Sequence, residues 1–150
     1  MNIFLTISLI SLVNFPLTSI FLDFAHRSHT FSLMVDPNTV NSVILFSFLG
    51  PAIDANGGLE YLNLSWNHFR GKGGVAIGKG LRANCSLQTL DISWNGLADE
   101  GAAAFGESLK ENNTLIDLDL TNNRISTEGA LAFAKGLQIN NTLKILRFVT

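Results

Sequence analysis

The sequence is poor in cysteine, proline and charge. Cys85 is the single cysteine among 150 residues, so an intrachain disulfide framework is excluded and a reducing compartment fits better than secretion. Charged residues make up only 15% of the chain, and the formal net charge is −2. No basic excess points to a nucleic-acid or other polyanionic partner, and we expect none.

Charge is scarcest in the first part of the chain. The charged side chains of residues 1–58 are Asp23, Arg27, Asp36 and Asp54. Residues 59–150, by contrast, carry nine basic and nine acidic side chains. We therefore treat residues 1–45 as an apolar leader that is unassigned or poorly ordered, and look for a folded region in residues 46–150.

The second part repeats with a period of 28 residues. The repeat is plainest in LNLSWNHF (62–69), LDISWNGL (90–97) and LDLTNNRI (118–125). Leucine, asparagine, glycine and alanine columns stay in step across these copies, which indicates a repeat architecture. The units are a partial one at 46–58, full ones at 59–86, 87–114 and 115–142, and a truncated one at 143–150.

Each unit contains two hydrophobic periods. The LxxLxL segment alternates as a strand with one buried face does. After it, Ala104, Phe105 and Leu109 follow the spacing of one helix face, as do Ala132, Phe133 and Leu137. Neither element buries its apolar face alone, so we predict stacked units of the α/β class. Parallel strands would line the concave face and helices the convex face.

The pattern LxxLxLxxNxL, followed by a glycine and an A-x-x-x-L helix, resembles the leucine-rich repeats of the ribonuclease-inhibitor type. The stretch LEYLNLSWNHFRGKGGVAIGKGLRANCS (59–86) is most similar to the leucine-rich repeat-containing protein 74 family. The resemblance implies a leucine-rich repeat solenoid, here a fragment of a right-handed β-α horseshoe. Members are mostly intracellular protein-binding scaffolds. The resemblance thus implies that this chain is a cytoplasmic, non-catalytic module that binds a protein partner and has no cofactor and no small-molecule substrate.

Two other classes stay open. The same repeat type occurs in NOD-like receptors and in the Ran GTPase-activating protein, so the chain is alternatively a fragment of such a protein. Residues 1–22 have no charged side chain, which suits a signal peptide or a membrane anchor and hence a secreted or membrane-tethered recognition domain. Against these stand the missing Lys or Arg near the start and the interruptions at Asn14 and Pro16. The remaining explanations for the leader are a splice or gene-model artefact, a poorly ordered segment, or a segment that covers the first repeat.

Several motifs suggest other chemistry, but the repeat explains them better. GGVAIGKG (73–80) resembles a phosphate-binding loop but has Gly80 where the hydroxyl residue belongs, and we predict a helix. Asn84, Asn112 and Asn140 head glycosylation sequons, yet they fill one repeat column, so we interpret each as a helix-ending asparagine. Histidine and acidic spacings complete no metal site. We expect no catalytic and no metal-ligating residue.

The strand residues between the leucine columns should face the concave side. Trp66 and Trp94 occupy one column in adjacent units, about 5 Å apart, which is close enough to stack. We predict that this face binds a protein, one presenting basic or aromatic groups. The alternative is that both tryptophans seal the strand-to-loop corner and are mostly buried. The predicted binding residues are Tyr61, Asn63, Trp66, Asp91, Trp94, Asp117, Asp119 and Arg147.

Overall fold

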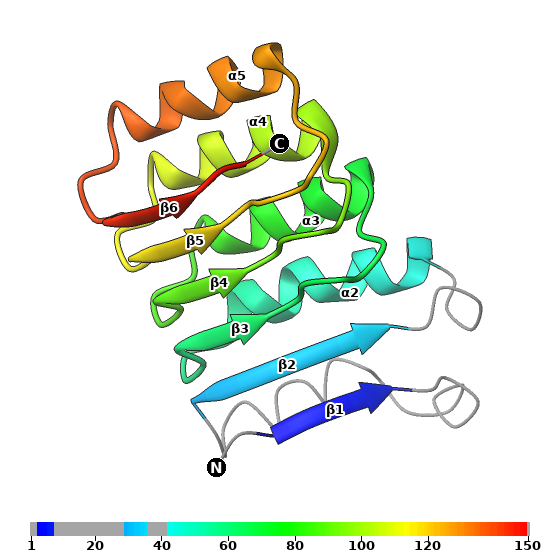
Figure 1. The fold of residues 1–150 in the computed structure, drawn as a ribbon. Coiled ribbons are helices and arrows are strands. Elements are labelled where there is room, and N and C mark those ends of the chain that lie inside the picture. Colours follow the sequence, from blue (N-terminus) through cyan, green and yellow to red (C-terminus); the bar gives the residue numbers. More distant parts are fainter. Residues whose placement is uncertain (1–2, 8–28, 36–41, 150) are drawn as a thin grey trace.

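The computed structural model describes residues 3–7, 29–35 and 42–149. They form two layers, a parallel sheet and a row of helices behind it (Figure 1). Six strands pair in chain order in this described part. They are β1 (Ile3–Ile7), β2 (Thr30–Val35), β3 (Tyr61–Asn63), β4 (Thr89–Asp91), β5 (Asp117–Asp119) and β6 (Ile145–Arg147). The helices are α2 (Ser42–Ala55), α3 (Gly71–Leu81), α4 (Ala98–Leu109) and α5 (Thr127–Leu137).

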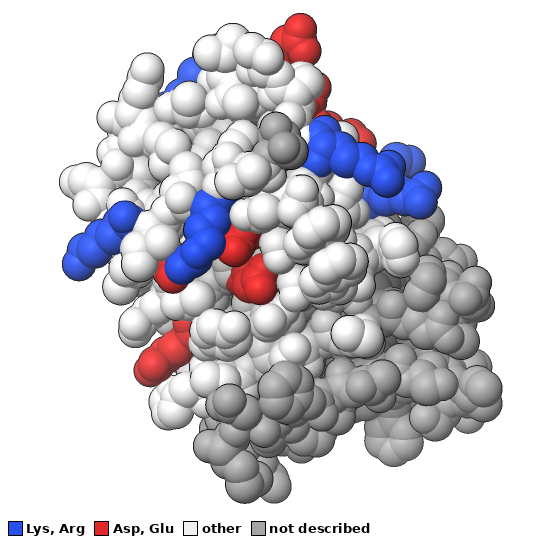
Figure 2. All heavy atoms as spheres, viewed as in Figure 1, with Lys and Arg blue, Asp and Glu red and all other residues white. Residues whose placement is uncertain are grey.

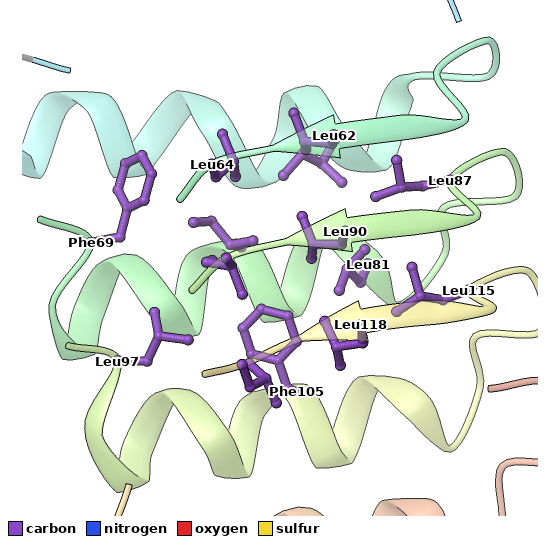
Figure 3. Packing of buried hydrophobic residues seen from close by; sticks show 14 of the residues in the cluster. Leu62, Leu64, Phe69, Leu81, Leu87, Leu90, Leu97, Phe105, Leu115 and Leu118 are labelled. Carbon is purple, nitrogen blue, oxygen red and sulfur yellow. The ribbon is translucent and has the colours of Figure 1, made fainter. Parts of the chain in front are cut away.

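The leucine columns of the sequence are rows in the structure. Leu62 pairs with Leu90, Leu90 with Leu118, and Leu118 with Leu146, each 28 residues on. The first three are fully buried and point from the sheet toward the helices (Figure 3). Burying one such side chain contributes about 1.5–3 kcal/mol. The predicted α/β solenoid, with strands on the concave face and helices on the convex face, is confirmed.

The sheet begins before the register that the sequence shows. Phe31 of β2 pairs with Leu62, and Ile3 of β1 pairs with Phe31. Both Phe31 and Leu33 are buried. The step from Phe31 to Leu62 is 31 residues instead of 28, so a search at a fixed period misses it. The helix of the partial unit also starts early, at Ser42, and runs through Pro51. The division at residue 45 stays a prediction.

Most of residues 1–22 lies outside the described residues, so the signal-peptide and anchor interpretations of this segment stay predictions. Among the residues that are described, none of the helices has the length and apolar character needed to cross a membrane.

Two rows of asparagine side chains bind the units together at the ends of the strands and helices. The Nδ2 of Asn95 donates to the carbonyl oxygens of Leu64, Ile92 and Ser93 at 2.8–3.1 Å. On the other edge, Nδ2 of Asn84 donates to Ile53 and that of Asn112 to Leu81. Because Asn84 and Asn112 are buried and bonded, the structural interpretation of these sequon asparagines is confirmed.

Glycine lets neighbouring helices approach closely. A Cβ on Gly106 of α4 would lie 2.8 Å from Cα of Phe133 in α5, closer than real contacts allow. A Cβ on Gly136 would collide with the carbonyl of Gly106. The stretch 73–80 lies inside α3, where Gly78 packs in the same way on Ala104, so the helix predicted there is confirmed.

Candidate functional site

The concave face is the side of the sheet turned away from the helices. On β3, β4 and β5 the middle residue is buried and its neighbours are exposed or half-buried, as the alternation predicts. Figure 2 shows acidic side chains near the middle of this face, with one basic side chain directly beside them and others toward its margins. The described part of this face therefore has a negative centre.

Trp66 and Trp94 stack on each other just past the ends of β3 and β4. Their ring centroids are 4.3 Å apart, and the ring planes differ by 9°. Trp66 is 60% exposed and Trp94 is 46% exposed. The predicted stacking is confirmed. The alternative, that the pair is mostly buried at the corner, is wrong, because both tryptophans are exposed.

Both tryptophans have a left-handed backbone, which sequence reasoning missed. The φ angle is 58° at Trp66 and 59° at Trp94, and Asn122 has 57° in the third unit. This conformation costs most L residues about 1–2 kcal/mol, and asparagine tolerates it best. Backbone hydrogen bonds between neighbouring units hold this left-handed conformation: the N–H of Trp66 donates to the carbonyl oxygen of Ser93, and that of Trp94 to the carbonyl oxygen of Thr121. In the sequence, the asparagine at position 122 was the one sign that residues in this column have a left-handed backbone.

Asn63, Asp91 and Asp119 close the turns that lead to this column. Asp91 Oδ1 accepts from the N–H of Ser93 at 3.0 Å and from its hydroxyl at 2.7 Å. Asn63 accepts the same pair of bonds from Ser65, and Asp119 Oδ1 accepts from the N–H of Thr121. Each side chain thus has a structural task that sequence reasoning did not foresee. In Asp91 and Asp119 only the Oδ1 atom accepts these turn-closing hydrogen bonds.

Asp117 and Arg147 form an ion pair across β5 and β6. The distances are 2.6 Å from Nη1 to Oδ1 and 3.3 Å from Nη2 to Oδ2. The hydrogen bond and the charge of Asp117 raise the pKa of the Arg147 guanidinium, with further contributions from the charges of Asp119 and Asp91. This guanidinium therefore already lies in the negative field of the concave face.

The remaining predicted residue, Tyr61, lies apart from this pair. It is 38% exposed on β3, three strands from Arg147 on β6. At ordinary strand spacing that is about 14 Å. Of the eight predicted residues, the structure brings together the tryptophans and the Asp117–Arg147 pair, with Asp91 and Asp119 as cross-strand neighbours between them.

We also searched the described part of the chain for metal-binding groups and reactive cysteines. None of its histidine, cysteine and acidic side chains form a group of three or more that could hold a metal ion. Cys85 is exposed in a loop.

Comparison with known proteins agrees with this geometry. A model described as "Leucine Rich repeat" matches residues 59–78, 83–106 and 111–134. Among solved structures, 42 chains match. One is "Leiomodin-1 Actin-Binding Site 2 (ABS2)", with a TM-score of 0.74 and 23% identity over 90% of this chain and 80% of that one. A search of curated proteins finds no match.

Fold, register and repeat matches together define the class. The matched stretches between residues 59 and 134 are leucine-rich repeats, and the described part of the chain has an α/β solenoid architecture. The solved match spans more than residues 46–150 alone, so it takes in residues ahead of position 46. This agrees with the pairing of β2 to β3.

Proposed function

We propose that this chain is a non-catalytic scaffold that binds a protein on its concave face. The contact would centre on the tryptophan patch, by which we mean Trp66, Trp94, Asp91 and Asp119. The observation that carries the proposal is the exposed, stacked Trp66–Trp94 pair.

Two physical arguments support a binding role for the pair. Stacked indole rings present a rigid apolar surface that loses little conformational entropy on contact, and tryptophan is enriched among the residues that dominate interface energies. A bulky side chain with a left-handed backbone also costs folding free energy, whereas the third unit uses the better-suited Asn122. Stability alone therefore does not favour tryptophan at these two positions.

The test is capture of partners from a cytosolic extract by the immobilised full-length chain. Trp94→Asn is the sharpest variant, because Asn122 shows that the same turn accepts asparagine. Lys110→Ala, at the end of α4 on the helix layer, is the matched control. We expect Trp94→Asn to lose the captured proteins and Lys110→Ala to retain them. Equal recovery by both variants would remove the proposal.

Purified monomeric actin is a defined first probe for the same assay. Its use is suggested by the similar leiomodin structure, which is an actin-binding site; the likeness of the two chains concerns the fold. Retention of actin by the wild-type chain and its loss with Trp94→Asn would identify one partner. If actin does not bind, the partner is another protein and the extract assay decides the proposal.

The finer assignments are proposals as well. From the stretch 59–86 we infer that the chain is a member of the leucine-rich repeat-containing protein 74 family. We also infer a cytoplasmic location, because Cys85 is a lone cysteine and forms no intrachain disulfide. Imaging of the full-length chain with a C-terminal tag tests the location. A secretory or membrane pattern would favour the alternative, a secreted or membrane-tethered recognition domain.

A further inference from the structure

The tryptophan row stops at Trp94. One face of the Trp94 ring lies on Trp66, so its other face is directed to the next unit, where Asn122 fills the same column. Asparagine has no ring to continue the stack. Trp94 is 46% exposed, so part of its side chain is accessible to a planar group from a partner.

The charges beside that position are negative. Asp119 lies three residues before Asn122, and its cross-strand neighbour on β4 is Asp91. In the described part of the chain, Oδ1 of each carboxylate closes a turn, and no hydrogen bond or ion pair reaches either Oδ2. Among the described residues, the Oδ2 atoms of Asp91 and Asp119 are thus without a partner, on the strands that lead into the turns of Trp94 and Asn122. Arg124 follows Asn122 by two residues, and its side chain lies beside Gly96 in the loop past Trp94, whereas Arg70 lies in the preceding unit.

The chain itself shows which cation this surface accepts. The guanidinium of Arg147 on β6 makes two hydrogen bonds to Asp117 on β5, which is one strand from Asp91 on β4. Guanidinium is planar, stacks on aromatic rings and donates two parallel hydrogen bonds to a carboxylate, whereas the ammonium of lysine is a compact point charge. Together Asp91, Asp117 and Asp119 oppose one guanidinium, so negative charge remains uncompensated here.

We propose that the partner segment presents an arginine, whose guanidinium stacks on the outer face of Trp94 and donates to Asp119 Oδ2. This rests on the proposed function and names the partner class, an arginine-bearing peptide segment. Asp91 adds long-range attraction. Asn122 leaves the space that the arginine fills.

The probe is a short acetylated and amidated peptide that alternates glycine and arginine, compared with its lysine and glutamate counterparts. The chain has two tryptophans, both in the patch, so intrinsic fluorescence reports this surface directly. We expect saturable quenching by the arginine peptide, several-fold weaker binding of the lysine peptide, and no binding of the glutamate peptide. No saturable change up to about 1 mM arginine peptide, or equal binding of all three, would overturn the inference.

Two variants with opposite expected effects sharpen the test. Asp119→Asn keeps the turn, as Asn63 does in the same column, and should weaken arginine-peptide binding about tenfold. Arg147→Gln releases Asp117 and should tighten it. If both variants bind the arginine peptide with the affinity of the wild type, the proposal is contradicted even though the wild type binds. Protein capture that is lost with Trp94→Asn but resists competition by the arginine peptide would retain the scaffold function and reject the arginine partner.

Discussion

The Nδ2 of Asn84 donates to the carbonyl oxygen of Ile53, 2.7 Å away and 31 residues earlier in the chain. The same nitrogen also donates to the carbonyl oxygen of Asn56 at 2.9 Å. Asn112 and Asn140 repeat this arrangement one and two units later. Asn56 differs, because its Oδ1 accepts from Gly58 and Leu59 while its buried Nδ2 has no partner among the described residues.

This difference predicts unequal costs for the same chemical change. Asn84→Asp places carboxylate oxygen against two carbonyl oxygens and removes two hydrogen bonds. Asn56→Asp removes no bond among the described residues and keeps both acceptor contacts. We expect Asn84→Asp to lower the free energy of unfolding by about 2 kcal/mol more than Asn56→Asp. Urea unfolding at neutral pH measures the difference. Equal losses would show that the bridging amide contributes little.

Close helix packing predicts an unusual result for a glycine in a helix. Alanine ordinarily stabilises a helix interior by about 1 kcal/mol over glycine. Gly106→Ala should instead destabilise by about 1–3 kcal/mol, because the new Cβ meets backbone atoms of Ala132 and Phe133 that have no rotamer to move. Gly57→Ala is the control, since a Cβ there meets nothing within 4 Å. A stabilising Gly106→Ala would mean that α4 and α5 separate easily.

Stability should fall in acid partly through Asp99. The hydroxyl and N–H of Ser126 both donate to this carboxylate at 2.7 Å and hold the pKa of Asp99 below its ordinary value. A lowered folded-state pKa means that the carboxylate stabilises the fold above about pH 4 and loses that contribution as the pH falls further. The unfolding free energy of the wild type should therefore drop more steeply below pH 4 than that of Asp99→Asn. Parallel pH profiles would contradict this.

Sequence periodicity predicted the parts of the fold that depend on identical packing in each unit. Leu62, Leu90 and Leu118 could be placed in one row because a common spacing puts them at one height in the stack. Phe31 could not, because the connection from β2 to β3 is three residues longer and aromatic packing replaces leucine.

The candidate site was predictable in part for a similar reason. Stacking of Trp66 on Trp94 follows from strand spacing alone. Their left-handed backbone and the turn-closing bonds of Asp91 and Asp119 depend on local hydrogen bonds, which hydrophobic spacing does not encode. Asparagine at position 122 marks the turn, but only once the structure shows which column it occupies.

The stability of Trp94→Asn separates a binding role from a structural one. The variant loses a stacking contact of about 0.5–1.5 kcal/mol between exposed rings. It also relieves a left-handed backbone whose cost, about 1–2 kcal/mol for most residues, is smaller for asparagine. The two effects oppose each other, so the free energy of unfolding should change by less than about 1 kcal/mol. Leu90→Ala, in the core between sheet and helices, should lose about 2–5 kcal/mol in the same urea titration.

The spectrum of the same Trp94→Asn sample provides the second half of this test. Coupled indoles that stack at 4.3 Å give a paired signal in ultraviolet circular dichroism, and the variant should lose that signal while retaining its cooperative melt. A loss of stability comparable to that of Leu90→Ala would instead mean that the fold needs the tryptophan pair. Reduced capture of a protein by Trp94→Asn would then report partial unfolding, and Asp119→Asn, which leaves both rings in place, would have to demonstrate the binding surface by itself.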